Sequence, residues 1–567
     1  MQTVVYVTHE RLYGSRSTRD QLLDELRPLA LAPLLKLLAA LNNELRSEES
    51  RPSRSPQHEL LSLFFCKDEI QRMADLDRSS PVVVLHRQQL LFLIKEALFV
   101  CSETGLDLAK DYRLLGNALL RANDLLAHIF PKTTTLRQKA LVAAAHFFGI
   151  QEAGAFHSYE YKILRSFWML QKTLPLLAKS QPFFDIPNLF KMQTRLELTD
   201  FQVLQFMTMT SFIREVARTR VTSPIDLPET WFSTTDFGAD AIKDYLSYIC
   251  ASPDELKHQV TQQREPSDFT AFRETPLLRL DGRLILLDFN FLCEKAESGP
   301  FWAARRQIPE AESNVYFSFW GNLFERYIST ILQLGAAPKF NKVIPDPRFP
   351  DGDQFTDCAV LSGDALLMVE TKTSTISAKA KYGGDLGYLE RTLRRNFVED
   401  GKSPKALRQI VSGLRKLFKD GLKLPDIQAN KINRIFPVLV TRDEVGSTVG
   451  INVFLNEIFQ ELMHAEGMKI SQSVAPLTCL SVEDLERVSP RGKDIGLDKV
   501  FEGYCRACRR DSAKLKPFML TPNDVLKQLA NKETADVLKD TAVEIGDLTE
   551  GHMKAGVESR VPHLSLR

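Results

Sequence analysis

Cysteine is scarce in this chain, which has 8 cysteines among 567 residues. They are scattered too thinly for a disulfide scaffold, and this usage fits a reducing compartment. Cys505 and Cys508 form one C-x-x-C pair, but no second pair or histidine cluster lies near it in the sequence. Because a structural zinc site needs about four ligands, we interpret these two as incidental thiols and expect a cytoplasmic protein.

Apolar runs of membrane-spanning length are also absent. The longest near miss, residues 26–41, is interrupted by proline and lysine and suits a buried helix. The first residues, MQTVVYVTHERLYGSR, lack a basic region followed by an apolar core, so we expect no signal peptide. Both absences predict a protein without a membrane partner.

The chain has no excess of charge of either sign and no motif for nucleotide hydrolysis. Lysine and arginine number 73 and aspartate and glutamate 72, a net charge of +1, so any electrostatic signal must be regional. No G-x-x-x-x-G-K-[ST] segment occurs, which excludes a P-loop ATPase within this sequence. Any dependence on ATP would therefore come from a partner subunit.

The length predicts several domains. Residues 1–265 carry leucine and isoleucine at helical spacing, which predicts a helical scaffold or a region that binds a partner or nucleic acid. Residues 266–450 alternate strand-like and helix-like segments and predict a mixed α/β domain. It begins with residues 277–292, two apolar runs around an Asp-Gly turn that predict a β-hairpin. Residues 451–567 are predicted to be mainly helical.

The mixed domain follows the order helix, three strands, helix, strand. The predicted elements are a helix at 315–335, strands at 340–349, 355–361 and 366–373, a helix at 404–420 and a strand at 434–443. Ser403 is placed as the N-cap of the second helix and Pro404 as its first residue. Pro437 favours an edge position for the last strand, because proline cannot donate to a sheet ladder.

Two charges are unexpected in the third predicted strand, LLMVETK, because burying either one alone would be costly. Residues two apart share a strand face, so Glu370 and Lys372 lie on one side. Asp357 lies on the preceding strand, and a turn at 362–364 would place it nearly opposite Glu370. The sequence therefore predicts two carboxylates and a lysine at the end of one hairpin.

Two carboxylates this close raise each other's pKa unless a cation lies between them. Mg²⁺ prefers oxygen ligands and keeps water in its remaining positions. Such a metal polarises a phosphate oxygen and activates water, and a nearby lysine stabilises charge that builds on the phosphate. Asp357, Glu370 and Lys372 are therefore predicted to catalyse phosphodiester hydrolysis. The alternative is a surface Glu–Lys pair beside an aspartate that caps a turn.

Asp357 followed by Glu370-Thr371-Lys372 resembles the PD-(D/E)xK signature of the restriction-endonuclease-like superfamily. The resemblance covers about residues 315–443. It implies a restriction-endonuclease-like α/β core, here with a large helical N-terminal region and a smaller, mainly helical C-terminal region.

A helix before the first core strand often supplies another carboxylate in this superfamily. Glu325 matches that position, in a segment FWGNLFERYI that is similar to one in Mrr-like nuclease domains. The resemblance thus implies a metal site of Asp357, Glu370 and Glu325, with Gln409 on the following helix contacting the site or the nucleic acid. Two features depart from the pattern. Asp357 follows threonine and not proline, and Gln409 is followed at the spacing of the RecB-type motif by Gly413 and not tyrosine.

The resemblance implies a Mg²⁺-dependent endonuclease, with Mn²⁺ as a substitute and DNA as the expected substrate, because the superfamily mostly cuts DNA. Together with the long helical extension it suggests an effector of prokaryotic defence against phage or plasmid DNA. Cutting both strands commonly requires two sites, which suggests a homo-oligomer. Two alternatives stay open: an RNase, or an inactive nuclease fold that serves as a nucleic-acid-binding or assembly subunit.

A local excess of positive charge follows the predicted catalytic strand. Between residues 379 and 434, 14 lysine and arginine residues oppose 6 acidic residues. A basic helix face and a glycine-rich basic loop at 377–388 suit contact with phosphates, although an ordinary solvated helix face is the alternative. The predicted nucleic-acid-binding residues are Lys379, Lys381, Lys405, Arg408, Gln409 and Arg415.

Overall fold

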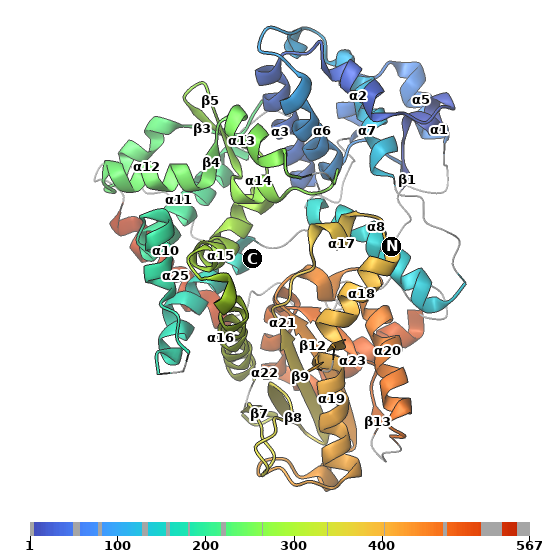
Figure 1. Ribbon diagram of the computed structural model, residues 1–567, viewed down its shortest axis with the longest axis vertical. Helices are drawn as coiled ribbons and strands as arrows, with labels where there is room; N and C mark the ends of the chain where they lie inside the picture. The colour runs from blue at the N-terminus through green and yellow to red at the C-terminus, as the bar shows by residue number, and fades with distance from the viewer. Residues whose placement is uncertain are drawn as a thin grey trace.

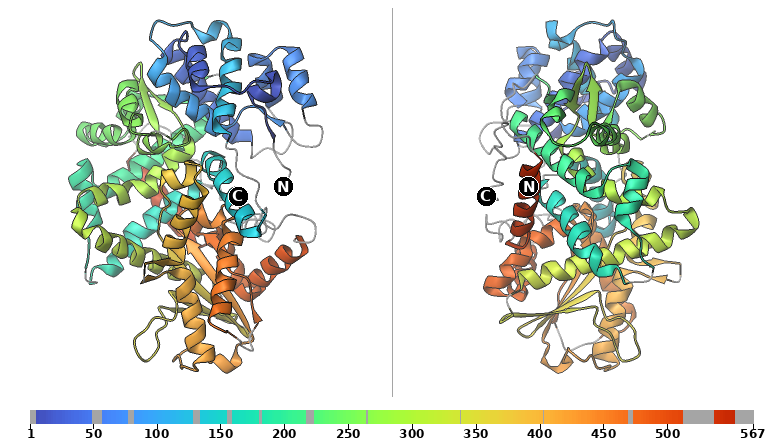
Figure 2. Two further views of the ribbon diagram at one scale, coloured as in Figure 1. Left: turned by 45° about the vertical axis from the view of Figure 1, so that its right-hand side comes forward. Right: turned by 90° about the vertical axis from the view of Figure 1, so that its left-hand side faces the viewer.

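The protein is a mixed α+β structure in which helices predominate (Figure 1). The computed structural model describes residues 5–48, 57–76, 82–127, 134–154, 159–179, 182–216, 223–263, 265–336, 338–401, 403–468, 473–511 and 536–552. Figures 1 and 2 place the first helices at one end of the molecule and the largest β-sheet at the other. Within these ranges, no helix has the length and apolar character needed to cross a membrane.

Helices make up most of the chain before residue 307. They are α1 (His9–Tyr13), α2 (Arg19–Leu26), α3 (Leu31–Glu48), α4 (Gln57–Phe64), α5 (Lys67–Asp75), α6 (Arg87–Val100), α7 (Gly116–Leu126), α8 (Leu136–Gly154), α9 (Tyr159–Phe167), α10 (Ile186–Thr194), α11 (Leu198–Val216), α12 (Ala239–Ile249), α13 (Pro253–Val260), α14 (Thr270–Glu274) and α15 (Phe289–Arg306). Leucine-rich faces of α3, α6 and α7 bury one core. Beside it, the short strands β1 (Val5–Tyr6) and β2 (Val82–Val83) pair in parallel.

A small second sheet contains the predicted hairpin. Its strands are β3 (Asp226–Pro228), β4 (Cys250–Ala251), β5 (Leu277–Leu280) and β6 (Arg283–Leu286), in the order β3-β6-β5-β4. Asp281 and Gly282 have φ angles of 54° and 70°, as a tight hairpin turn requires. The hairpin ends before the predicted residue 292, because α15 begins at Phe289. Since β3 and β4 precede residue 265, this sheet joins segments on both sides of the predicted domain boundary.

The remaining elements build the large sheet and its cover. They are α16 (Ser313–Gly335), β7 (Asn341–Pro345), β8 (Cys358–Ser362), β9 (Ala365–Lys372), α17 (Ala378–Tyr382), α18 (Leu386–Phe397), β10 (Glu399–Asp400), β11 (Ser403–Pro404), α19 (Ala406–Leu414), β12 (Arg434–Thr441), α20 (Ile451–Ala465), β13 (Ser473–Val474), β14 (Thr478–Ser481), α21 (Val482–Val488), α22 (Gly492–Ile495), α23 (Leu497–Asp511) and α25 (Asp536–Gly551). The predicted order of helix, three strands, helix and strand is confirmed, with additional short elements between β9 and β12.

The large sheet has the order β13-β12-β9-β8-β7, and β14 pairs with β12 on the same edge as β13. Strands β7, β8 and β9 form an antiparallel meander, whereas β12 and β14 run parallel to β9 and to each other. The segment after residue 450 therefore supplies two strands as well as helices, which the prediction of a mainly helical region did not include.

The two faces of the sheet contact different helices. Leu367 and Val369 of β9 belong to a core shared with α16, whereas Leu366 and Met368 belong to a core shared with α19 and α20. All four side chains are buried, which explains why the strand is apolar on both faces. By the same alternation, the side chains of Glu370 and Lys372 lie on the face of the sheet against which α19 packs.

Pro437 is not on an edge strand, contrary to the prediction. It pairs with Met368 in the interior of the sheet. On the other side of β12, β13 contacts residues up to 435 and β14 begins at 438. Pro437 therefore falls in the gap between two partner strands, where no ladder donor is needed.

Helix α19 begins later than predicted. Ser403 and Pro404 belong to β11, which pairs with β10 in a short hairpin, so Lys405 takes the N-cap position. The apolar stripe predicted for this helix is buried, with Leu407, Ile410 and Leu414 fully covered. The position of the helix against the sheet therefore follows its apolar spacing even though its first turn does not follow the capping pattern.

Helix α16 ends against a neighbouring helical turn and not at a glycine cap. Gly335 is the last helical residue, and a Cβ there would overlap Ser489. The Ser489 hydroxyl donates to the carbonyl of Ile331 at 2.9 Å. The glycine is therefore needed for close approach and not for left-handed backbone geometry.

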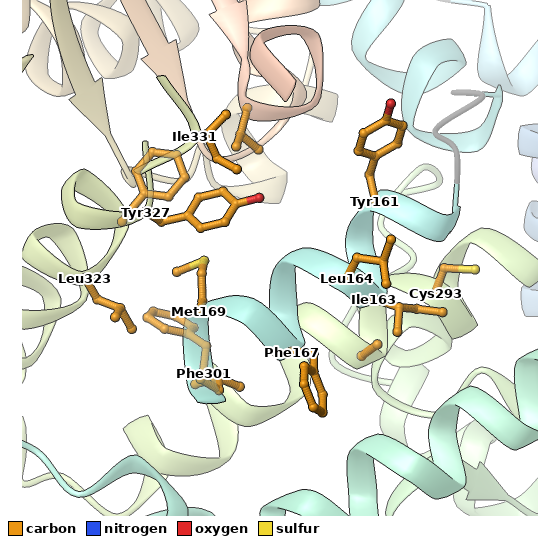
Figure 3. Packing of buried hydrophobic residues seen from close by; sticks show 14 of the residues in the cluster. Tyr161, Ile163, Leu164, Phe167, Met169, Cys293, Phe301, Leu323, Tyr327 and Ile331 are labelled. Carbon is orange, nitrogen blue, oxygen red and sulfur yellow. The ribbon is translucent and has the colours of Figure 1, made fainter. Parts of the chain in front are cut away.

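Helix α15 continues through Pro300, which lacks the N–H that the Ala296 carbonyl would otherwise accept. The hydroxyl of Ser166 on α9 donates to that carbonyl at 2.7 Å. Apolar residues of α9, α15 and α16 pack together (Figure 3). Helices α9, α15 and α16 and one face of the large sheet therefore share one continuous core.

A buried ion pair strengthens the same junction. Arg165 of α9 donates to Glu486 of α21 at 3.0 Å and to Glu297 of α15 at 3.2 Å. Tyr327 of α16 also donates its hydroxyl to Glu486. Burial opposed by the Arg165 charge leaves the pKa of Glu486 raised to about 7, whereas that of Glu297 lies below its ordinary value because two arginines flank it.

Candidate active site

The structure confirms that Asp357 lies opposite Glu370. The antiparallel register of β8 and β9 pairs Cys358 with Val369. Asp357 immediately precedes Cys358 and Glu370 immediately follows Val369, so the two carboxylates lie one residue beyond this pair. Both residues are buried, with 5% and 1% of their surface exposed. The turn that joins β8 to β9 contains Gly363, where φ is 61°, and Asp357 and Glu370 lie at nearly equal distances along the chain from it.

Strand β9 fixes the orientation of the Asp357 carboxylate. Its Oδ2 accepts hydrogen bonds from the backbone N–H of Thr371 at 2.7 Å and from the Thr371 hydroxyl at 2.9 Å. Its Oδ1 accepts from the side-chain amide of Gln354 at 3.2 Å. One carboxylate oxygen is thus held by the neighbouring strand and the other by the amide of an exposed residue, Gln354.

Glu370 and Lys372 form an ion pair on the same face of β9. The Lys372 ammonium lies 3.2 Å from Oε1 of Glu370. The Thr356 hydroxyl donates to the carbonyl of Val369 at 2.8 Å and lies 3.4 Å from Oε2 of Glu370. The lysine side chain keeps 17% exposure while the glutamate side chain keeps 2%, so the positive charge lies nearer to solvent.

Glu325 of α16 belongs to the same electrostatic group. Burial and the Asp357 carboxylate raise the pKa of Glu325 to about 8, and Glu370 and Asp346 add to this effect. Lys372 opposes it. The helix therefore brings a third carboxylate within electrostatic range of the hairpin.

The site holds more negative than positive charge. Burial and the charge of Asp357 raise the pKa of Glu370 to about 7, against the opposing charge of Lys372. Burial alone would lower the pKa of the Lys372 ammonium, but Glu370, Asp357 and Glu325 together raise it above its ordinary value. One lysine thus faces three carboxylates, which favours an additional cation.

The residues present fit a hard divalent cation in their chemistry. Asp357 and Glu370 offer carboxylate oxygens, the ligands that Mg²⁺ prefers. Across the described ranges, no three His, Cys, Asp or Glu side chains already converge on one point that could hold a metal ion. Asp357 and Glu370 are therefore the residues that would hold a cation, and Glu325 would reach it after a side-chain rearrangement.

Gln409 lies on α19, which packs on the face of β9 that carries Glu370. Its Oε1 is buried and has no hydrogen-bond partner among the described residues. One turn later, a Cβ at Gly413 would lie 2.6 Å from the carbonyl oxygen of Phe355, two residues before Asp357. A glycine at this position therefore lets α19 approach the site strand closely, which a tyrosine would prevent.

Most of the predicted basic face is neutralised by nearby carboxylates. Arg408 pairs with Glu399 at 2.6 Å, and Arg415 lies 3.6 Å from Asp420 and 3.7 Å from Glu466. The local excess of positive charge in the sequence therefore does not translate into a continuous unpaired surface on α19. The prediction that these arginines bind nucleic acid rests on the ion pairs opening when a phosphate arrives.

The glycine-rich segment at 377–388 is not a loop. It forms α17 and the first residues of α18, with Ser377 and Asp385 as N-caps. Lys379 on α17 lies over the ring of Tyr388 at 5.4 Å, and Lys381 lies over that of Phe148 at 5.8 Å. Together with Lys405 at the N-cap of α19, they stay predicted nucleic-acid contacts.

Three residues near the site were not predicted from the sequence. Thr371 and Thr356 position the two carboxylates through the contacts given above, and the hairpin register could have indicated Thr371. Asp346 follows β7 with a φ of 44° and donates its N–H to the carbonyl of Asp357 at 2.9 Å. Its signal was the Pro-Asp dipeptide at 345–346.

Comparison of this chain with protein families, with curated proteins and with solved structures gives no match.

Proposed function

We propose that this protein is a metal-dependent nuclease of the PD-(D/E)xK type that hydrolyses phosphodiester bonds in DNA. The observation that carries the proposal is the proximity of the Asp357 and Glu370 carboxylates, one residue beyond the Cys358–Val369 pair of β8 and β9, with Lys372 beside them. Buried carboxylates destabilise a fold unless they are compensated, so their assembly around one lysine favours a functional role.

Each side chain has a role that its surroundings support. Asp357 and Glu370 would hold Mg²⁺ or Mn²⁺, with Glu325 as a third ligand. When bound, the cation polarises a phosphate oxygen and lowers the pKa of a coordinated water. Lys372, the more exposed member of the ion pair, would stabilise the negative charge that builds on the scissile phosphate. The buried Oε1 of Gln409 would accept a hydrogen bond from a water or from an N–H or O–H group of the substrate.

The arrangement of elements also supports the proposal. Helix α16, the meander β7-β8-β9, helix α19 and the parallel strand β12 follow one another in the order that the resemblance implies. The carboxylates come from α16, from the residue just before β8 and from the end of β9. Fold alone does not define an activity, so the side-chain set carries more weight than the topology.

The substrate and setting are further parts of the proposal. DNA is favoured over RNA through the resemblance, and the same resemblance supports a cytoplasmic effector of defence against phage or plasmid DNA. A homo-oligomer would supply two active sites for cutting both strands. An RNase is the alternative that the same site chemistry would equally permit.

Cleavage assays test the proposal and its alternative together. Supercoiled plasmid and end-labelled RNA are incubated with the full chain and Mg²⁺, Mn²⁺ or EDTA. Asp357→Ala and Lys372→Ala are compared with Lys342→Ala, whose side chain is 57% exposed and pairs with Asp426 on the surface. Cutting that requires the metal, persists in Lys342→Ala and falls at least 100-fold in the other two variants is expected.

The outcomes separate the hypotheses. Cutting of RNA in preference to DNA would favour the RNase. Cutting that survives both Asp357→Ala and Lys372→Ala would contradict the site assignment. Binding of plasmid without cutting under every metal condition would favour the inactive nuclease fold.

A further inference from the structure

A pocket of about 440 Å³ lies at the carboxyl ends of the parallel strands of the large sheet. Its floor includes Thr373 and Thr375 after β9, Arg442 after β12 and Ser481 at the end of β14. Helices α9, α12, α14 and α15 supply the opposite wall. In open α/β sheets this edge is where ligands commonly bind. The carboxylates of the candidate active site do not line the pocket, although Lys372 immediately precedes Thr373.

The glutamates of the pocket wall already have cationic partners. Glu274 pairs with Arg306 at 2.5 Å. Glu294 pairs with Arg273 and lies 3.4 Å from Lys162. Glu297, which pairs with Arg165, also lies 3.5 Å from Arg442. Glu483, the fourth glutamate of the lining, pairs with Arg487. Each of the four therefore already has a cationic partner, and a further positive charge on the wall finds none of them unpaired.

Lys295 is such a charge. Only 5% of its surface is exposed, and in the described part of the chain it has no ion pair or hydrogen bond to a carboxylate. Its ammonium lies 3.6 Å from the centre of the Tyr248 ring, which is fixed because the Tyr248 hydroxyl donates to the carbonyl of Gly299 at 2.7 Å. Burial lowers the pKa of Lys295 to about 7. An anion bound beside it would satisfy the ammonium.

An exposed aromatic side chain lies on the same face of α15. Trp302 lines the pocket with 43% of its surface exposed, seven residues after Lys295. Positions seven apart share a helix face, about 10 Å apart along its axis. An ammonium at one end of this interval and an indole at the other match a ligand with a phosphate and an aromatic ring. Threonine hydroxyls across the pocket could bind polar groups between them.

We propose that this pocket binds a nucleotide, with its phosphate at Lys295 and its base stacked on Trp302. Base stacking on tryptophan and phosphate contact with lysine are the usual means of binding a single nucleotide unit. The nucleotide has two sources, a free nucleoside monophosphate or one unit of a single strand that continues past the candidate active site. The site is distinct from the Asp357–Glu370 pair, so its occupancy does not depend on the proposed nuclease activity.

Calorimetric titration of the full chain in EDTA tests the proposal without any cleavage. The probes are adenosine 5′-monophosphate, a five-nucleotide single-stranded DNA and inorganic phosphate. Lys295→Met replaces a buried ammonium by an apolar chain of similar length, so it is expected to fold. Trp302→Ala truncates an exposed side chain, and Lys342→Met is the matched control on the surface of β7.

The expected result is that Lys295→Met and Trp302→Ala each weaken nucleotide binding at least tenfold while Lys342→Met leaves it unchanged. Tighter binding of the monophosphate than of the oligonucleotide would assign the free nucleotide, and the reverse would assign the strand. Absence of binding by both nucleotide probes would overturn the proposal. So would equal affinity for inorganic phosphate, or binding that neither pocket variant weakens.

Discussion

The Asp357 carboxylate accepts two hydrogen bonds from one residue of the neighbouring strand, Thr371, at 2.7 Å from its N–H and 2.9 Å from its hydroxyl. Both contacts reach the same oxygen, Oδ2, and together hold it against β9. Thr371 lies between the glutamate and the lysine of the site, so one strand carries two functional side chains on one face and a positioning side chain on the other.

Thr371→Val should weaken metal binding while preserving the fold. Valine keeps the backbone N–H and the shape of threonine but removes the hydroxyl donor. Loss of such a positioning contact typically reduces metal affinity about 10- to 100-fold, and loss of one hydrogen bond costs about 1 kcal/mol of stability. Titration with Mn²⁺ measures the affinity, with Thr330→Val on the exposed face of α16 as the control. Unchanged affinity would contradict the positioning role.

Glu370→Gln should stabilise the metal-free protein at neutral and alkaline pH. The pKa of Glu370 is raised from 4.5 to about 7 in the folded chain, so the unfolded chain releases this proton first as the pH rises. The wild type therefore loses stability as the pH rises from about 4.5 to about 7. The glutamine variant should lose less stability, by on the order of 2 kcal/mol at pH 8.

Urea unfolding midpoints measured in EDTA at pH 5 and pH 8 check this expectation. Glu461→Gln, whose side chain is 61% exposed, is the control. If the unfolding midpoint of Glu370→Gln falls between pH 5 and pH 8 as much as that of the wild type, the pKa of the Glu370 carboxyl is not raised in the folded protein.

Arg165→Met should destabilise the junction between the N-terminal helices and the sheet. The substitution leaves Glu486 and Glu297 buried without their shared cation, and breaking a buried pair from one side typically costs about 3–5 kcal/mol. Replacing Glu486 by glutamine in the same chain should recover part of the loss. The coupling energy between Arg165 and Glu486 is obtained from the unfolding midpoints of the two single variants and the double variant. Strictly additive losses of stability would contradict an interaction between the two residues.

Gly413→Ala should disturb the site through the backbone. The new Cβ would lie 2.6 Å from the Phe355 carbonyl oxygen and 3.2 Å from Met368, so α19 must move away from β9. We expect a loss of about 1–3 kcal/mol, as overpacked positions show, together with reduced cleavage. Ser412→Ala, the preceding position on the same helix, should leave both stability and cleavage unchanged.

The sequence was sufficient to predict the hairpin that carries the candidate site. The predicted turn at 362–364 and the apolar strand before Glu370 were enough to place Asp357 near Glu370, because hairpin register follows from local sequence periodicity. The predicted start of α19 is wrong because Ser403 and Pro404, although they are favourable residues at a helix N-terminus, pair with β10. The prediction of an edge position for Pro437 is wrong because the proline is accommodated by a gap between β13 and β14. These strands follow it in the chain, so the sequence near Pro437 does not reveal the gap.

Features that depend on packing between distant segments could not be predicted. The carboxylates that pair with Arg408 and Arg415 come partly from other elements, so a charge count could not show that the basic face is neutralised. Lys295 reads in the sequence as an ordinary helix lysine. Its burial follows from Tyr248, which is 47 residues earlier and on another helix.

Mn²⁺ binding by the wild type and by Asp357→Asn, measured by calorimetry at pH 8, tests the central claim most directly, because it requires neither the correct substrate nor an activating partner. Binding of the metal at the site in the wild type and its loss in Asp357→Asn, with Lys342→Met unaffected, is the predicted result. Failure of the wild type to bind Mn²⁺, or equal binding by Asp357→Asn, would contradict the assignment of the Asp357–Glu370 pair as a metal site.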